Sequence, residues 1–459
     1  MKYIDEERIK ELLKNTKQAS SSEIKAILDK AKSLKRLKLK ETAALLAVKD
    51  KKTIKNIRLA AGYVKDAIYG RRIVLFAPVY ISNVCLNKCL YCAFQAGNTA
   101  IKRKVLSIDE IKEQTRWLLE RGHKRILMVA SEAGISGKSN ADYYAEAIKA
   151  IYEVSAARNR IKRVNINCAP LNVEEFRLLK SSGIGTYQIF QETYHEETYR
   201  KVHPQGPKND PDNRIDAVDR AFTAGIDDVG IGVLYGLYDY KFDTLAMLMH
   251  IEHMEEKFNV GPHTISVPRI EPALGISFIE DMPYKVSDEE FKNAAAIIRL
   301  SVPYTGMILS TREAPAMRDE LFGLGISQVS AESRTSPGGY SSSNDSGQFM
   351  LSDERTLDEV IGKLIEKKFI PSFCAACYRK ERTGETFMSL AKPGDIKDKC
   401  NLNALITLKE YLDDFASGKV KKAGYKLIDG LSRKLDKKSR GQLERFFEEV
   451  DKGARDLYV

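Results

Sequence analysis

The sequence predicts an α/β protein built on a (β/α)8 TIM barrel, with a helical extension before the barrel and a mainly helical domain after it. Eight short runs rich in β-branched and aromatic residues recur along the middle of the chain, and each is followed by a longer stretch with helical periodicity. The length of 459 residues, 43% of them hydrophobic, is sufficient for a barrel with additions at both ends.

The eight runs are the expected barrel strands. They are RIVLFAPVYIS from Arg72, RILMVAS from Arg125, RVNINCAP from Arg163, TYQIFQET from Thr186, DVGIGVLYG from Asp228, HTISVPRI from His263, MILSTRE from Met307 and SQVSAES from Ser327. Amphipathic segments such as IDEIKEQTRWLLERG separate them. Repeated strand–helix alternation implies parallel strands joined by right-handed crossovers, which favours a closed barrel over a doubly wound open sheet.

Changes in composition divide the chain into three parts. Residues 1–70 are charged and rich in Lys, Glu, Leu and Ala, which is typical of helices. Residues 71–345 hold the barrel, and residues 346–459 form the C-terminal domain. The Gly/Ser/Pro stretch of residues 333–349 ends the barrel, and its simplest interpretation is a flexible linker.

The overall composition excludes several function classes. The formal charge is +11, but the lysines are spread along the chain and no basic run is interleaved with aromatic residues, so we expect no nucleic-acid partner. Solvated helix faces or an acidic protein partner would account for the charge. The N-terminus does not resemble a signal peptide, and no apolar run is long enough to span a membrane. We therefore expect a cytoplasmic protein.

Three cysteines lie close together directly after the first strand. Cys85, Cys89 and Cys92 form a C-x3-C-x2-C group in a loop at the C-terminal mouth of the barrel, where barrel enzymes place their chemistry. Thiolates bind zinc or iron–sulfur clusters, and a closed site of either kind normally needs four ligands. Three cysteines would leave one iron of a 4Fe–4S cluster open to a small molecule.

This C-x3-C-x2-C group resembles the signature of the radical S-adenosylmethionine superfamily, including the aromatic residue before the last cysteine, Tyr91. The resemblance implies that S-adenosylmethionine binds the open iron and is cleaved to a 5′-deoxyadenosyl radical. It places Tyr91 beside the adenine, the end of the second strand at the methionine amino group and Glu192 at the ribose hydroxyls. The polar strand-end residues expected at this cofactor site are Ser131, Glu132, Asn165, Asn167 and Glu192. The structural alternatives are helix capping by Ser131 and an ion pair of Glu192 with neighbouring basic residues.

A second group of cysteines lies in the C-terminal domain. Cys374, Cys377 and Cys400 form a C-x2-C-x22-C pattern, again with three thiolates. Such a pattern is typical of a metal centre. We interpret it as an auxiliary 4Fe–4S cluster with its own open iron; a zinc site completed by another residue is the alternative.

Taken together, the two cysteine groups and three phrases resemble the tyrosine lyase maturases of FeFe-hydrogenase. The phrases are HPQGPKND from His203, GPHTISVPR from Gly261 and LSTRE from Leu309. The resemblance covers nearly the whole chain. It implies that the radical cleaves the Cα–Cβ bond of L-tyrosine to give 4-cresol and dehydroglycine, and that dehydroglycine yields carbon monoxide and cyanide at the auxiliary cluster. An electron donor and other hydrogenase maturation proteins are the partners it implies.

Three further residues are candidates for binding the substrate or metal. Arg312 ends the seventh strand, where its guanidinium can pair with the carboxylate of tyrosine, with Ser310 assisting; an ion pair with Glu313 is the alternative. His263 begins the sixth strand and so faces the opposite end of the barrel. The family resemblance implies that this histidine holds an extra iron at the auxiliary cluster. Two centres at opposite ends would require the barrel interior to conduct dehydroglycine between them.

Two other functions remain open. The barrel half is also similar to the tyrosine lyase of thiamine synthesis, which makes dehydroglycine (2-iminoacetate) and lacks the C-terminal cysteines. A non-enzymatic iron–sulfur scaffold is the other alternative, although the polar residues expected at the barrel mouth argue against it.

Overall fold

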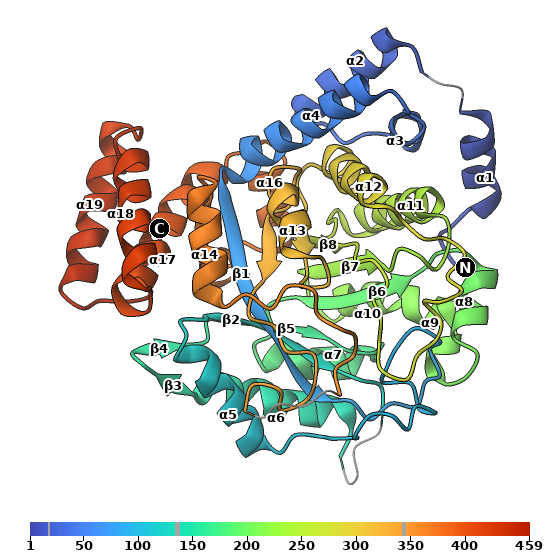
Figure 1. Ribbon diagram of the computed structural model, residues 1–459, viewed down its shortest axis with the longest axis horizontal. Coiled ribbons are helices and arrows are strands. Elements are labelled where there is room, and N and C mark those ends of the chain that lie inside the picture. The colour runs from blue at the N-terminus through green and yellow to red at the C-terminus, as the bar shows by residue number, and fades with distance from the viewer. Residues whose placement is uncertain (17–18, 134–137, 342–345) are drawn as a thin grey trace.

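The computed structural model describes residues 1–16, 19–133, 138–341 and 346–459, and the eight predicted strands form a closed parallel barrel (Figure 1). The strands follow one another round the barrel in chain order, and β10 pairs with β1 to close it. All eight runs that the sequence predicted are barrel strands. They are β1 (Arg72–Ser82), β2 (Arg125–Ala130), β5 (Arg163–Asn167), β6 (Tyr187–Glu192), β7 (Val229–Val233), β8 (Thr264–Ser266), β9 (Gly306–Leu309) and β10 (Gln328–Ser330).

Helices between the strands cover the outside of the barrel. Several begin with a capping box, as at Ser107 and Glu110 before α5 and at Ser287 and Glu290 before α12. The helices are α5 (Ile108–Leu119), α6 (Asn140–Glu153), α7 (Val173–Ser181), α8 (Glu196–Val202), α9 (Pro211–Ile215), α10 (Ala217–Thr223), α11 (Tyr240–Phe258), α12 (Asp288–Ser301) and α13 (Pro315–Leu321). A short hairpin of β3 (Ser155–Ala156) and β4 (Asn159–Arg160), which the sequence did not predict, follows α6.

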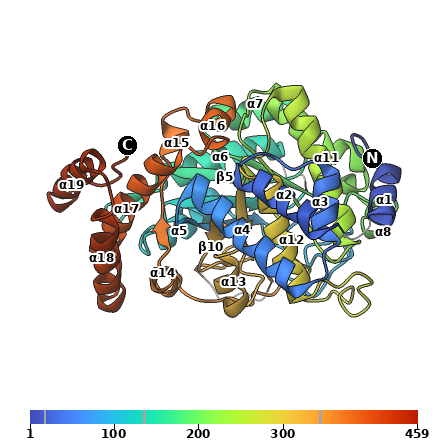
Figure 2. The ribbon, with the colours of Figure 1, turned by 90° about the horizontal axis from the view of Figure 1, so that it is seen from above.

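The N-terminal extension is helical, as predicted. Its helices are α1 (Glu6–Asn15), α2 (Ser21–Lys32), α3 (Leu39–Leu46) and α4 (Lys51–Tyr69). They pack on α11 and α12 at one side of the barrel, as the view from above shows (Figure 2). None of the helices in the described ranges is long and apolar enough to cross a membrane.

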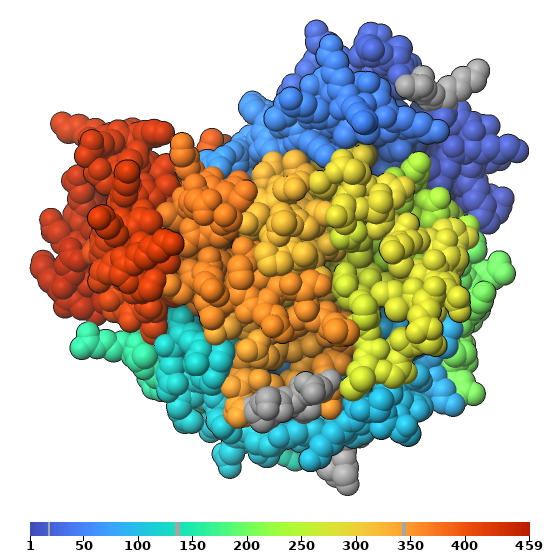
Figure 3. Space-filling view, viewed as in Figure 1, coloured from blue at the N-terminus to red at the C-terminus, as the bar shows by residue number. Residues whose placement is uncertain are grey.

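A ninth strand, β11 (Ile370–Ser372), was not predicted. It pairs in parallel with the first residues of β1, on the edge that β2 occupies further along β1. This pairing attaches the C-terminal domain to the bottom of the barrel. That domain contains α14 (Leu357–Glu366), α15 (Ala376–Arg379), α16 (Gly384–Ala391), α17 (Lys397–Asp414), α18 (Gly418–Ser432) and α19 (Lys437–Asp451), and its last helices project as a lobe (Figure 3).

The Gly/Ser/Pro stretch after β10 packs against the barrel mouth. Tyr340 is buried, its hydroxyl donates to the Pro78 carbonyl at 2.7 Å, and its amide donates to the Gln114 side chain at 2.8 Å. The flexible-linker interpretation is therefore wrong for the described part of this stretch; residues 342–345 lie outside the described residues.

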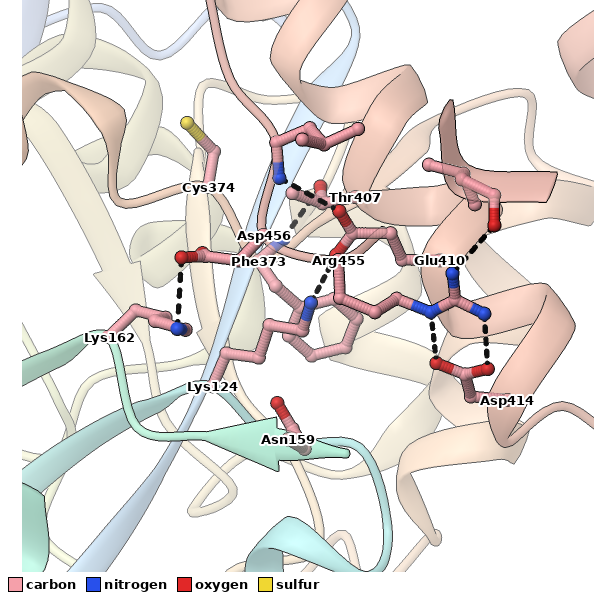
Figure 4. A network of polar contacts seen from close by, with 12 residues as sticks. Lys124, Asn159, Lys162, Phe373, Cys374, Thr407, Glu410, Asp414, Arg455 and Asp456 are labelled. Atoms are coloured by element: carbon pink, nitrogen blue, oxygen red, sulfur yellow. Dashed lines mark hydrogen bonds and ion pairs between the residues drawn. The ribbon is translucent and has the colours of Figure 1, made fainter. Parts of the chain in front are cut away.

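Arg455 and Asp456, which follow α19, contact the C-terminal domain and the barrel (Figure 4). Arg455 forms a bidentate pair with Asp414, and Asp456 pairs with Lys162 at 2.9 Å. The amide of Leu457 donates to Glu410 at 3.1 Å. These contacts hold α17 against the bottom of the barrel, beside Cys374.

A buried ion pair reinforces the same junction and gives a stability prediction. Lys124, just before β2, pairs with Glu410 on α17, and both side chains are buried. In Lys124→Met the carboxylate keeps only an amide partner, so we expect a loss of about 3–5 kcal/mol in the free energy of unfolding. Chemical denaturation followed by circular dichroism measures it.

The matched control is Lys138→Met, which removes an exposed pair with Glu146 and should cost less than about 1 kcal/mol. Equal effects of the two substitutions would contradict the assigned role of the buried pair.

Candidate functional site

A cavity of about 200 Å³ opens at the C-terminal mouth of the barrel. Its walls come from the ends of the barrel strands, from the loop after β1 and from Ser333, Thr335, Gln348 and Phe349. Most of the residues predicted at this mouth line it together: Cys85, Cys89, Tyr91, Cys92, Ser131, Glu132, Asn167, Glu192, Ser310 and Arg312. The structure thus brings the first cysteine group and the expected cofactor and substrate residues into one space.

Backbone hydrogen bonds fix the cysteine loop from both sides. The amides of Leu86 and Leu90 donate to the carbonyls of Glu132 at 2.8 Å and Val202 at 3.0 Å. Gly206 has a φ of +99°, and a Cβ there would lie 2.4 Å from Asn87 Oδ1, so only glycine permits this close approach. The Arg103 guanidinium donates to four carbonyls of the loop region.

The three thiols form a donor set that fits an iron–sulfur cluster. The side-chain amides of Asn87 and Gln348 lie 3.7 Å from Cys85 Sγ and 3.8 Å from Cys92 Sγ, where they can donate to sulfur. Burial raises the pKa of the Cys89 thiol to about 12, so this group is protonated near pH 7 until a metal displaces the proton. Gln348 was not predicted, because it lies in the stretch interpreted as a linker.

Glu192 has a strained backbone at the end of β6. Its φ is +72°, and the pairing of β6 with β7 shifts register between Phe190 and Glu192. Such strain in a residue other than glycine is often found at functional sites. The carboxylate accepts a hydrogen bond from Lys208 Nζ at 2.6 Å and lies 3.5 Å from Arg214. The ion pair foreseen as the structural alternative is thus present, and binding of ribose by Glu192 stays a prediction.

The hydroxyl of Tyr91 contacts two residues, His203 and Lys208, that were not predicted at this site. This hydroxyl lies 2.8 Å from His203 Nε2 and accepts from Lys208 Nζ at 3.0 Å. Burial lowers the pKa of His203 and raises that of Tyr91, so both groups are neutral near pH 7. Both His203 and Lys208 belong to HPQGPKND, and that phrase was the signal that could have identified them.

Not all of the polar residues predicted at the ends of β2 and β5 reach the cavity at the barrel mouth. Ser131 donates to the Val84 carbonyl, and Glu132 accepts from Asn87 at 2.7 Å, so both support the cysteine loop. Asn167 lines the cavity, but Asn165 does not. The Asn165 side chain instead accepts from Arg163 Nε at 2.9 Å, deeper in the barrel. Its predicted place at the mouth is wrong, because the two residues lie at different depths along β5.

Arg312 lies on the opposite wall of the cavity. Its guanidinium stacks on the Phe349 ring at 3.4 Å, and among the described residues it has no ion-pair partner. The alternative pairing with Glu313 is excluded, because Glu313 is buried and pairs with Arg269. Ser310 Oγ accepts from the Arg312 amide at 3.4 Å. A positioned guanidinium free to pair can receive a substrate carboxylate.

A second cavity lies at the opposite end of the barrel and contains the C-terminal cysteines. Cys374 follows β11, Cys377 lies in α15 and Cys400 lies in α17, and all three line the cavity with His263. The predicted meeting of His263 with the second cysteine group is therefore present. The His263 ring packs on Phe387 at 4.5 Å, and its Nδ1 lies 3.6 Å from Asp228.

Burial sets the protonation of this second site. It raises the pKa of the Cys400 thiol to about 12, an effect that Arg72 opposes, and it lowers the pKa of His263 to about 4. His263 is therefore neutral near pH 7, and its free nitrogen can bind a metal.

Each of the two cavities is lined by three thiols that could bind a metal centre. Within the described ranges, no three His, Cys, Asp or Glu side chains converge as the ligands of one metal ion would. A cubane cluster instead binds each thiolate through a different iron, so its ligands surround a cavity. Both cysteine groups have that form.

Polar side chains lie among the apolar ones in the barrel interior. Gln188 and Thr264 approach to 3.5 Å there, and a Cβ on Gly306 would lie 2.6 Å from the Gln328 side chain. Barrels are usually filled by bulky branched residues. The two cavities are separate, and the described residues show no continuous passage, so the conduit stays a prediction that requires these side chains to move.

Two family models match the barrel region. Residues 79–250 match the radical SAM superfamily, and residues 266–370 match the biotin and thiamin synthesis associated domain. The 2-iminoacetate synthase of Escherichia coli (strain K12) is 33% identical over 306 residues, which cover 66% of this chain and 78% of that protein.

Two solved structures are similar over nearly the whole chain. One is the FeFe-hydrogenase maturase HydG, 47% identical, with a TM-score of 0.97 and complete coverage of both chains. The other is HydG from Carboxydothermus hydrogenoformans, 40% identical, with a TM-score of 0.84 and coverage of 96% of this chain and 97% of that one.

Proposed function

The chain belongs to the radical SAM superfamily, in the family of the FeFe-hydrogenase maturase HydG, and from this membership we propose that it cleaves L-tyrosine and converts the dehydroglycine formed to carbon monoxide and cyanide. It is a radical SAM enzyme, and its family implies a 4Fe–4S cluster and S-adenosylmethionine. One observation supports the two-step scheme above all: two groups of three cysteines lie in separate cavities at opposite ends of one barrel.

At the first site, Cys85, Cys89 and Cys92 would hold the cluster, which with S-adenosylmethionine supplies a 5′-deoxyadenosyl radical. The remaining residues of the mouth bind and orient the reactants. Arg312 would receive the tyrosine carboxylate with help from Ser310, because none of the described carboxylates forms an ion pair with it. The proposed cofactor contacts are Tyr91, Ser131, Glu132, Asn167 and Glu192.

At the second site, Cys374, Cys377 and Cys400 would hold an auxiliary cluster, with His263 available for an extra iron. Its neutral imidazole and the buried thiols supply donors of the type that iron–sulfur centres use. The lower cavity would receive dehydroglycine through the barrel interior.

The remaining features of the proposal are the domain boundaries and the partners. We place the domain boundaries at residues 1–70, 71–345 and 346–459. L-Tyrosine, an electron donor and other hydrogenase maturation proteins would be the partners, and the cytoplasm the location.

Substituting Arg312 tests the first site. In Arg312→Gln we expect kcat/KM for tyrosine to fall about 10- to 100-fold, because a charge-assisted pairing is lost. Production of 4-cresol over a range of tyrosine concentrations measures this. Arg121→Gln is the matched control, because Arg121 also stacks on an aromatic ring at 3.4 Å but lies outside the cavity. An unchanged KM and kcat in Arg312→Gln would refute the assignment.

A 2-iminoacetate synthase without the second step is the other candidate, favoured by the 33% identity to the E. coli enzyme. Anaerobic reconstitution, followed by reaction with S-adenosylmethionine, L-tyrosine and reductant, distinguishes the two candidate functions. We expect carbon monoxide and cyanide together with 4-cresol; 4-cresol alone would establish the simpler lyase.

A further inference from the structure

Three neighbouring barrel strands begin with an arginine. Arg72, Arg125 and Arg163 are the first residues of β1, β2 and β5, which lie side by side in the sheet. All three side chains line the lower cavity with the C-terminal cysteines. A cluster of guanidinium groups in a buried cavity is costly unless each charge has a partner.

Arg163 has a carboxylate partner, whereas Arg72 and Arg125 form no ion pair with any of the described residues. Arg163 donates to Asn165 at 2.9 Å and to Thr186 at 2.6 Å, and it pairs with the buried Asp228. Arg125 donates one hydrogen bond, to the Cys374 carbonyl at 2.6 Å, and the Arg72 guanidinium lies over the Tyr69 ring at 5.0 Å and near the Cys400 thiol. The Nε atoms of Arg72 and Arg125 are buried without a hydrogen-bond partner among the described residues.

The charges of the cavity leave a positive excess. Among the described residues, three arginines line the cavity, and one carboxylate, Asp228, contacts its lining through Arg163 and His263. A 4Fe–4S core held by three thiolates would contribute about one net negative charge. That offsets only part of the excess, so the cavity keeps a net positive charge.

We propose that Arg72 and Arg125 bind the carboxylate of a small α-imino or α-keto acid at the lower end of the barrel, beside the second cysteine group. This inference rests on the proposed function, in which the tyrosine-derived fragment still carries its carboxylate. Arg312 would hold that carboxylate at the upper site, and the arginine pair would receive it at the lower one. Guanidinium groups suit this task because they donate to carboxylates bidentately.

Glyoxylate is a stable α-keto acid that tests the proposal by binding alone. We expect the anaerobically reconstituted full chain, saturated with S-adenosylmethionine and L-tyrosine at the upper site, to bind one glyoxylate in calorimetric titration. Arg125→Lys keeps the charge but not the bidentate geometry, and it should weaken binding at least about tenfold. Arg72→Lys should act likewise, whereas Arg121→Lys, outside the cavity, should bind as the unaltered protein does.

The two arginines could instead serve only to neutralise the charge of the cysteine thiolates. Iron and sulfide content, measured on the same samples, distinguishes that role from carboxylate binding. We expect Arg125→Lys and Arg72→Lys to retain their iron while losing glyoxylate affinity. Glyoxylate affinity equal to that of the unaltered protein in both lysine variants, or no glyoxylate binding by the unaltered protein, would overturn the proposal.

Product analysis links the site to the reaction. With tyrosine turning over, Arg125→Lys should form 4-cresol normally, release more glyoxylate through hydrolysis of escaped dehydroglycine, and form less carbon monoxide. If the unaltered protein forms no 4-cresol, the proposed function fails, and the binding result still decides whether the arginine pair is a carboxylate site.

Discussion

Replacing Cys89 by alanine is expected to abolish formation of 5′-deoxyadenosine, 4-cresol and carbon monoxide together. Two thiolates cannot hold the first cluster, and without it nothing at the barrel mouth can cleave S-adenosylmethionine. Substituting a residue that only supports a metal ligand lowers metal affinity or activity about 10- to 100-fold. Substituting a ligand itself should therefore lower the activity more than roughly 100-fold. Deoxyadenosine formed anaerobically with reductant, quantified by liquid chromatography, is the measurement.

Iron analysis shows whether Cys89→Ala loses only the first of the two proposed clusters. The second cysteine group is untouched in Cys89→Ala, so total iron should fall by about half and not to zero. Cys168→Ala is the matched control, because Cys168 is a buried cysteine beside the same cavity but lies outside the cysteine loop. Retained deoxyadenosine formation in Cys89→Ala would show that the radical does not arise at this loop.

The sequence predicted the barrel because local signals repeat along it. Each strand is a short apolar run and each crossover an amphipathic helix, so periodicity alone located all eight strands. The two cysteine groups could also be found in the sequence, because grouped cysteines are chemically distinctive. Most of the polar residues at the mouth followed from the rule that barrel enzymes use the carboxyl ends of their strands.

Features that depend on distant contacts were not predictable. The three-residue strand β11 is too short for a periodic signal and exists because β1 extends beyond β2. The segment after β10 has the composition of a linker, yet it supplies Gln348 and Phe349 to the cavity. Asn165 was misplaced because alternation along a strand gives the side of the sheet but not the depth within the barrel.

The enclosure of the arginines that begin β1, β2 and β5 also depends on contacts between residues that are distant in the sequence. The recurrence of these arginines is visible in the sequence, but a charged residue at the start of a strand is usually solvated. Only the pairing of β11 with β1, which places the C-terminal domain over the bottom of the barrel, encloses them with the cysteines.

Replacing both Cys374 and Cys377 by alanine should separate the two proposed reactions. Formation of 4-cresol should remain within about twofold of that of the unaltered protein, because the mouth and its cavity share no residue with the lower site. Carbon monoxide and cyanide should become undetectable, because one remaining thiol cannot hold a cluster. Dehydroglycine would then leave unconverted and accumulate as its hydrolysis product, glyoxylate, in an amount close to that of 4-cresol.

His263→Ala refines this expectation, since it removes the imidazole from the lower cavity and leaves all three thiols in place. It should retain the auxiliary cluster signal in electron paramagnetic resonance while lowering carbon monoxide formation, with 4-cresol unchanged. Circular dichroism checks that the double cysteine variant folds normally. If this folded variant lost 4-cresol and carbon monoxide to the same extent, the two ends of the barrel would not act as separate centres. Both reactions would then have to take place at the mouth, where Arg312 and the first cysteine group lie.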